Sequence, residues 1–213
     1  RKIEMNPYFS KPQNENLTLL IVDDEKDVRL ATTEFLTSMY HFVADQADSV
    51  AAALLLLENS KYDAIISDYE MEDMSGIDLL KIIRRNGDST PFIIFTGRGR
   101  EEVVISAFEN KADGYVMKGG EVRSQFADLA HKVIAIVEQR NTERALREIE
   151  DRFKDIYMNS PIAIELYDQH GILIDVNPAC CDLFGIYSGD AVRGFYLFHD
   201  PNIPKEHGDI LHQ

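Results

Sequence analysis

The chain has 213 residues, of which 28% are charged and 45% hydrophobic, and its formal net charge at pH 7 is −15. This composition is typical of a globular protein with one large or two ordinary domains. The acidic balance disfavours a nucleic-acid partner and an anionic membrane surface, because both require clustered Lys and Arg. The longest apolar run, residues 50–57, is far shorter than the roughly 20 residues of a membrane-spanning helix, and the N-terminus lacks a secretory signal. We therefore expect a cytoplasmic protein that binds neither nucleic acid nor membrane.

The cysteines and the first residues give two further expectations. Cys180 and Cys181 are the only cysteines, and two adjacent thiols make no disulfide framework. We expect a reduced protein with part-buried thiols; a redox or cofactor-attaching role is the alternative. The chain begins with Arg1 rather than Met, which indicates a fragment or added residues. Residues 1–16 are polar and contain two prolines, so we expect a loose leader.

Between residues 17 and 118, short apolar runs alternate with amphipathic stretches. The first amphipathic stretch predicts a helix that buries one face, formed by Val28, Ala31, Phe35 and Met39. The expected strands are residues 17–22, 41–47, 62–67, 91–95 and 114–117, and the later helices are expected to start at a Ser49 cap, near Ser75-Gly76, at Glu101-Glu102 and near Val122. Such alternation predicts an α/β fold in which right-handed crossovers give five parallel strands in the order 2-1-3-4-5.

The last of these helices is expected to be unusually long, because no Pro or Gly interrupts residues 122–159. Two apolar stripes with 3-4-3 spacing follow each other along it, the first formed by Phe126, Leu129, Val133 and Ile136 and the second by Leu146, Ile149, Phe153 and Ile156. We expect one long helix or two joined helices, with a parallel coiled coil in a homodimer as one interpretation. Packing of the helix within its own chain is the alternative.

Four of the expected strands end in polar residues. Asp23 and Asp24 follow the first strand, Asp68 the third, Thr96 the fourth and Lys118 the fifth. Because ligands bind outside the carboxyl ends of the strands in such sheets, we expect these side chains to share one crevice. Carboxylates held together repel one another, which requires a raised pKa or a cation. A hard divalent ion with oxygen ligands, Mg²⁺, fits that need.

Residues 17–140 resemble a response-regulator receiver domain, which implies a flavodoxin-like, doubly wound fold. The shared features are the acid pair Asp23-Asp24, Asp68, Thr96, Tyr115-x-x-Lys118, Met71 and Gly76 at three and eight residues after Asp68, and intervals of 44 positions from Asp24 to Asp68 and 22 from Thr96 to Lys118. Each motif alone is weak, but their order and spacing together are specific.

The resemblance implies a role for each of these residues. Asp68 is the phosphoacceptor, Thr96 and Lys118 bind the phosphoryl group, and Tyr115 moves inward as part of a switch. The phosphoryl donor is a sensor histidine kinase or a phosphotransfer protein, and the chain itself is a signalling domain rather than an enzyme.

The resemblance also implies a metal site and shows where this chain departs from the family. Asp24 and Asp68 would bind Mg²⁺ directly, Asp23 through water, and Glu70 through its backbone carbonyl. Many receivers carry Pro after the lysine and four residues after the aspartate, where this chain has Gly119-Gly120 and Glu72. The loop after the fifth strand is therefore expected to be more mobile. Glu70 and Arg98 occupy variable positions and are expected to modulate the site by pairing across it; a rim ion pair without kinetic effect is the alternative.

The sequence pattern of the last 55 residues differs from that of the preceding helix. The runs IAIELYD and ILIDVN around the turn QHG predict a hairpin, and NPACCDLFGI predicts the start of a helix. This stretch resembles the beginning of a PAS domain, an α+β module, as in receiver–PAS sensor or hybrid histidine kinase proteins. The expected organisation is a leader at 1–16, a receiver domain at 17–140, a helical linker at 141–158 and a partial PAS domain at 159–213.

The leading hypothesis is a phosphoacceptor receiver of a two-component phosphorelay that passes its switch through the long helix to a PAS sensor module. One alternative is a receiver-fold interaction scaffold that is not phosphorylated. Another is a phosphohydrolase of the haloacid-dehalogenase type, which requires DxDxT after its nucleophile strand. Here residues 23–27 read DDEKD, which fits that pattern poorly.

Overall fold

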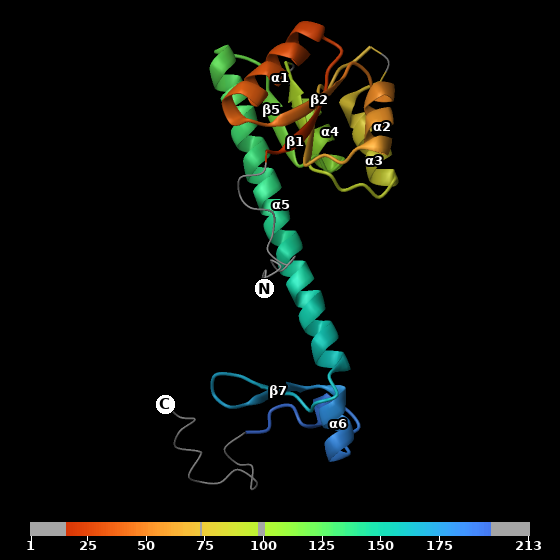
Figure 1. Ribbon diagram of the computed structural model, residues 1–213, viewed down its shortest axis with the longest axis vertical. Coiled ribbons are helices and arrows are strands. Elements are labelled where there is room, and N and C mark those ends of the chain that lie inside the picture. Colours follow the sequence, from red (N-terminus) through yellow and green to blue (C-terminus); the bar gives the residue numbers. More distant parts are fainter. Residues whose placement is uncertain (1–15, 73, 98–100, 197–213) are drawn as a thin grey trace, which may run out of the picture. The chain divides into compact units, whose positions relative to one another are not determined.

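The computed structural model describes residues 16–72, 74–97 and 101–196, with the side chains of 101–103 excepted. The chain divides between Arg144 and Ala145 into two compact units, and each is described by itself. Figure 1 shows the elements of both. Within the described residues, no helix is long and apolar enough to cross a membrane.

The first unit is a five-stranded parallel sheet with the strand order β2-β1-β3-β4-β5, as the sequence predicts. The strands are β1 (Thr18–Val22), β2 (Val43–Ala47), β3 (Ala64–Ser67), β4 (Phe92–Thr96) and β5 (Gly114–Met117). The helices are α1 (Lys26–Tyr40), α2 (Val50–Asn59), α3 (Gly76–Arg85), α4 (Glu101–Glu109) and the start of α5 (Val122–Asn159).

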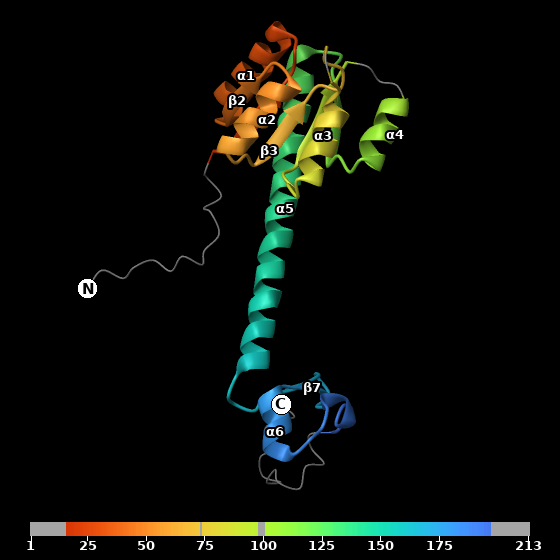
Figure 2. The ribbon, with the colours of Figure 1, turned by 90° about the vertical axis from the view of Figure 1, so that its right-hand side faces the viewer.

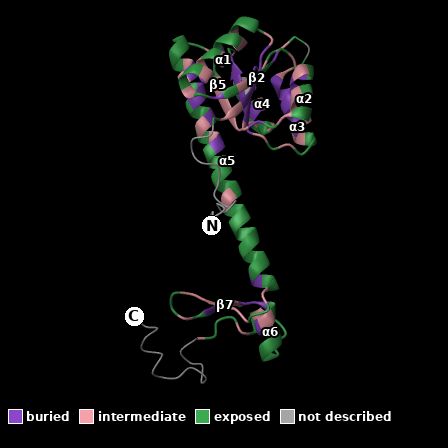
Figure 3. Ribbon diagram, viewed as in Figure 1, coloured by how far each residue is buried: buried purple, intermediate pink, exposed green. Residues whose placement is uncertain are grey.

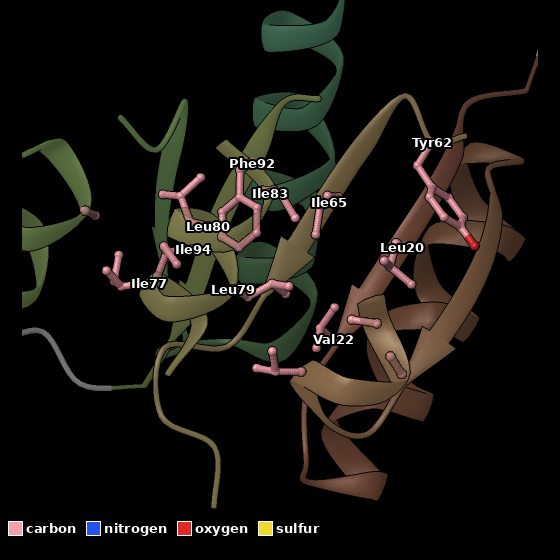
Figure 4. Close-up of a cluster of buried hydrophobic side chains, with 14 residues drawn as sticks. Leu20, Val22, Tyr62, Ile65, Ile77, Leu79, Leu80, Ile83, Phe92 and Ile94 are labelled. Atoms are coloured by element: carbon pink, nitrogen blue, oxygen red, sulfur yellow. The ribbon is translucent and has the colours of Figure 1, made fainter. Parts of the chain in front are cut away.

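Helices cover both faces of this sheet (Figure 2), because successive strand residues point to opposite sides. Leu20 and Val22 of β1 pack with α2 and α3, in the cluster drawn in Figure 4. Leu19 and Ile21 pack on the other side with α1 and α5. The four residues of β3 are all buried, as expected for a central parallel strand. This double-sided core fixes the sheet from which the strand ends project.

Side-chain caps set the starts of α2 and α3. Ser49 caps α2 by accepting a hydrogen bond from the Ala52 N–H, as predicted. Ser75 and Asp78 form a capping box at the start of α3, in which each side chain accepts a hydrogen bond from the other residue's backbone N–H. Several strand starts differ by one or two residues from the prediction. The β2 strand begins at Val43 rather than at residue 41, because His41 is the left-handed C-cap of α1.

The predicted buried face of α1 is wrong in part. Ala31 and Met39 are exposed, and the fully buried residues of this helix are Thr32 and Leu36, with Phe35 partly buried beside them. Thr32 and Leu36 are one turn apart and define a face rotated from the predicted stripe. The error arose because α1 offers apolar residues on more than one side, so periodicity alone did not fix the phase.

The α5 helix is continuous over 38 residues. Its first stripe is confirmed as a packing face in part, since Phe126, Leu129 and Val133 are buried against the sheet. In the second stripe, Leu146, Ile149, Phe153 and Ile156 are 55–65% exposed. The later part of the α5 ribbon is mostly green in Figure 3, the colour of exposed residues.

The second unit contains the predicted hairpin, formed by the antiparallel strands β6 (Glu165–Tyr167) and β7 (Leu173–Val176). The α6 helix (Pro178–Phe184) follows, with Asn177 as its N-cap, and a short 3-10 turn (Gly189–Ala191) comes after it. The small buried core of the second unit consists of Leu173, Val176 and Cys180. Cys180 and Cys181 are free thiols, and burial raises the pKa of Cys180 to about 11.

Asn177 joins the parts of the second unit. It is fully buried, and its side-chain amide makes four hydrogen bonds. The Nδ2 group donates to the carbonyls of Tyr157 and Ile162, and Oδ1 accepts from the N–H groups of Ile164 and Cys180. One side chain therefore holds the last turn of α5, the segment before β6 and the start of α6 together.

Candidate functional site

The polar residues that follow the strands do converge at the carboxyl edge of the sheet. Asp23, Asp68 and Thr96 are only 3%, 7% and 2% exposed. Backbone hydrogen bonds align the strand ends, since the Asp68 N–H donates to the Val22 carbonyl. Burying two carboxylates in this way is costly unless a counter-charge or hydrogen bonds compensate them.

Lys118 supplies that counter-charge. Its Nζ lies 2.7 Å from Asp23 Oδ2 and 2.9 Å from Asp68 Oδ1. Its backbone N–H donates to the Thr96 carbonyl at 2.7 Å, which fixes the end of β5 to the end of β4. The ammonium also lies 5.5 Å from the centre of the Phe95 ring, within the range of a cation–π contact. Lys118 is thus held in place although Gly119-Gly120 follow it.

The electrostatics of this group follow from burial and from the ammonium. Burial raises the pKa of Asp23 above its ordinary value, and the opposing effect of Lys118 does not cancel it. For Lys118, burial alone would lower the pKa, but hydrogen bonds to Asp23 and Asp68 outweigh it and the pKa is raised. The ammonium therefore stays charged near neutral pH, where it compensates one of the two buried carboxylates.

The backbone of Asp68 is held by the residues around it. The Ser67 hydroxyl donates to the Asp68 carbonyl at 2.9 Å. The Gly76 N–H donates to the Tyr69 carbonyl at 2.9 Å, so the first residue of α3 closes the turn after β3. This turn positions the Asp68 side chain beside the Lys118 ammonium.

The acid pair divides its hydrogen bonds between two loops. Asp23 Oδ1 accepts from the Glu25 N–H at 2.9 Å, and Asp24 Oδ2 accepts from the Glu72 N–H at 2.9 Å. Together with Lys118, these contacts engage both oxygens of Asp23 and one each of Asp24 and Asp68. Asp24 Oδ1 and Asp68 Oδ2 have no hydrogen-bond or ion-pair partner among the described residues.

This donor set suits one kind of cation. Among the residues that the structure describes, no three His, Cys, Asp or Glu side chains form a cluster that could hold a metal ion. Two available carboxylate oxygens are nevertheless what Mg²⁺ commonly uses, because it keeps several of its waters and takes one or two carboxylates from the protein. The residues present therefore fit Mg²⁺ better than a metal that needs a full protein cage.

The remaining predicted site residues are placed as follows. Thr96 is buried at the end of β4. Tyr115 is half-buried on β5 and packs against the core cluster on the α3 side, where burial raises its pKa. Glu70 is exposed in the loop after β3. Arg98 lies outside the described residues, so its pairing with Glu70 stays a prediction.

Sequence reasoning missed two contributors to the site. Phe95 lies beneath the Lys118 ammonium, and its place one residue before Thr96 on a central strand was the available signal. The Glu72 N–H contact with Asp24 gave no signal, because a backbone donor does not depend on the residue type unless that residue is Pro.

Known proteins share this architecture. The family model of the response regulator receiver domain matches residues 19–130. Chemotaxis protein CheY-3 of Vibrio cholerae serotype O1 is 32% identical over 107 residues, which cover 49% of this chain and 82% of that protein. Sensory transduction protein LytR of Staphylococcus saprophyticus is 33% identical over 139 residues, which cover 65% of this chain and 50% of that protein.

A solved structure agrees with these sequence relatives. The receiver domain of the Francisella response regulator 1452 matches with a TM-score of 0.52 and 27% identity, over 59% of this chain and 99% of that chain. The fold, the converging strand ends and the matched residues lead to one conclusion: this chain belongs to the response regulator receiver domain family of two-component signalling.

Proposed function

We propose that the chain is a phosphoacceptor receiver in which Asp68 takes a phosphoryl group from a phosphohistidine on a sensor kinase or a phosphotransfer protein. The observation that carries this proposal is the buried bridge of Lys118 between Asp23 and Asp68, at the carboxyl edge of a receiver sheet. A structural ion pair alone does not explain why a second carboxylate is buried beside the first, since burial of each costs free energy.

The reaction is a displacement at phosphorus. A carboxylate oxygen of Asp68 forms the new P–O bond while the P–N bond of the donor breaks, and the released imidazole takes up a proton from solvent. Phosphoryl transfer depends mainly on positioning and on charge neutralisation. Lys118 remains hydrogen-bonded to Asp68 Oδ1 and is placed to neutralise the phosphoryl oxygens, to which the Thr96 hydroxyl donates.

Mg²⁺ would be held by Asp24 Oδ1, Asp68 and the Glu70 backbone carbonyl, with Asp23 contributing through water. When bound, it supplies positive charge that offsets the carboxylates and the transferring phosphoryl group. Asp23 fits the water-mediated role because both of its oxygens already have hydrogen-bond partners.

The proposed switch begins with the charge that phosphorylation adds, nearly two negative units at neutral pH. Thr96 moves toward the phosphoryl group, and Tyr115 follows inward on β5. The face formed by α4, β5 and the start of α5 is the element whose conformation differs between the unphosphorylated and the phosphorylated state. Glu70 and Arg98 would modulate access to the site.

The proposed organisation is a receiver domain at 17–140, a helical linker at 141–158 and the beginning of a PAS domain at 159–213, in a cytoplasmic protein. A homodimer through α5 is supported by the exposed stripe of Leu146, Ile149, Phe153 and Ile156, which has the 3-4 spacing of a coiled-coil seam. The hairpin and α6 are consistent with a PAS start.

Intact mass tests this function. The full chain is incubated with Mg²⁺ and a small acyl-phosphate donor, in parallel with Asp68→Asn. One added phosphoryl group in the wild type and none in the variant is the expected result. No adduct with an intact donor would favour the unphosphorylated scaffold, and steady turnover of a phosphomonoester would favour a phosphohydrolase.

A further inference from the structure

Asp24 and Glu72 connect two loops of the site that are far apart in sequence. Asp24 follows β1 and Glu72 lies in the turn after β3, yet the Glu72 N–H donates to Asp24 Oδ2 at 2.9 Å. The two residues are 48 positions apart. This hydrogen bond differs from the Asp23–Glu25 contact, which closes a local turn within one loop.

A backbone donor on a carboxylate has two consequences. Hydrogen bonds to an ionised acceptor are among the stronger ones in proteins, so this contact restrains the Asp24 side chain. It also occupies Oδ2 and leaves Oδ1 as the one Asp24 oxygen available to a cation. Loss of a hydrogen-bonding partner that orients a metal ligand typically weakens metal affinity by about 10- to 100-fold.

We propose that the Glu72 backbone N–H is a positioning group for Asp24, which holds this carboxylate in the orientation that binds the divalent cation. The contact depends on residue 72 not being Pro, because Pro has no N–H to donate. The Glu72 side chain, which is exposed, has no part in it. The effect on the cation rests on the proposed function, whereas the hydrogen bond itself does not.

Two substitutions separate the N–H group from the side chain. Glu72→Pro removes both the N–H and the side-chain charge, and Glu72→Ala removes the charge alone. We expect the Mg²⁺ affinity of the Pro variant, measured by calorimetric titration of the full chain, to be about 10-fold weaker than that of the Ala variant. Equal affinities of the two variants would overturn the proposal.

The hydrogen bond is tested without metal, so that a misfolded Pro variant cannot obscure the result. In metal-free wild type, the amide protons of Glu72 and Glu25 are expected to exchange slowly. Asp24→Ala should speed exchange at Glu72 and not at Glu25, whereas Asp23→Ala should do the reverse. Unchanged exchange at Glu72 in Asp24→Ala would overturn the proposal.

The outcomes distinguish this inference from the proposed function. If wild type binds Mg²⁺ and takes up a phosphoryl group while the Pro and Ala variants bind equally, only the positioning role fails. If wild type binds no Mg²⁺, the metal-assisted function fails, and the positioning role fails with it.

Discussion

The backbone of Gly76 lies against the backbone of Asp68. A Cβ atom on Gly76 would lie 2.1 Å from the Asp68 carbonyl oxygen and 2.7 Å from Ser67 Oγ, distances that no real Cβ contact tolerates. The first residue of α3 thus sets how closely the helix approaches the end of β3, and thereby where Asp68 stands.

Gly76→Ala is expected to displace Asp68 and to lower the free energy of unfolding by about 3 kcal/mol, because a backbone oxygen cannot move aside as a flexible side chain can. Urea unfolding measures the loss, and phosphoryl uptake should fall as well. Gly119→Ala is the matched control, since a Cβ there meets nothing within 4 Å. Equal stability of the two variants would contradict the account.

Lys118→Met should destabilise the receiver unit by about 3 kcal/mol in metal-free buffer, because it leaves two buried carboxylates without their counter-charge. Added Mg²⁺ should restore part of that loss by neutralising them. Lys81→Met serves as the control, because the pair that Lys81 forms with Asp78 is exposed and such pairs contribute little. A Lys118→Met protein as stable as the wild type would show that the bridge does not stabilise the fold.

The capping box predicts a pH dependence. The hydrogen bond from Ser75, together with smaller contributions, lowers the pKa of Asp78 below its ordinary value of 3.8. A lowered folded-state pKa contributes stability that is present above pH 3.8 and is lost as the pH falls through the folded-state value. The stability difference between wild type and Asp78→Asn should therefore be constant near neutral pH and shrink in acid. A difference that grows on acidification in urea titrations would contradict this.

Asn177→Ala should loosen the second unit, because it leaves the Ile164 and Cys180 N–H groups and the Tyr157 and Ile162 carbonyls without this partner. Unmet buried polar groups cost about 1–3 kcal/mol each. Amide exchange at Ile164 and Cys180 should accelerate, while the core of the receiver unit keeps its protection. Asn159→Ala removes a contact to the Asp155 carbonyl within α5 and should change neither amide.

The exposed stripe on α5 predicts self-association. Ile149→Glu places a charge in the proposed seam and should convert a dimer into a monomer of 24.3 kDa. Light scattering at tens of micromolar measures the mass. Asp151→Asn, a change away from the stripe, should leave the dimer intact. A monomeric wild type in both phosphorylation states would exclude the dimer.

Much of the first unit follows from its sequence. The strand order could be predicted because buried parallel strands and connecting helices leave few topologies, and the convergence of Asp23, Asp68 and Lys118 follows from that order. The buried face of α1 could not be predicted, because its apolar residues do not lie on a single side of the helix. Thr32 is buried where a purely apolar pattern would not place it.

Backbone contacts were the other feature that the sequence did not reveal. The Glu72 N–H on Asp24 depends on how two loops meet in space. The sequence predicts a helix start within NPACCDLFGI, but the hydrogen bonds of Asn177 to Tyr157 and Ile162 depend on the fold. The site residues at the strand ends can be predicted from the sequence, because the sheet topology brings them to one edge. Contacts between loops can be identified only in the structure.

The central claim is that Asp68 is the residue that becomes phosphorylated, and borohydride trapping tests it most directly. Reduction of an aspartyl phosphate gives homoserine, which peptide mass mapping locates in the chain after labelling with Mg²⁺ and an acyl-phosphate donor. The account predicts homoserine at position 68 and none at positions 23 and 24. Homoserine at another acidic residue, or a phosphorylated chain without any reducible aspartyl phosphate, would contradict it.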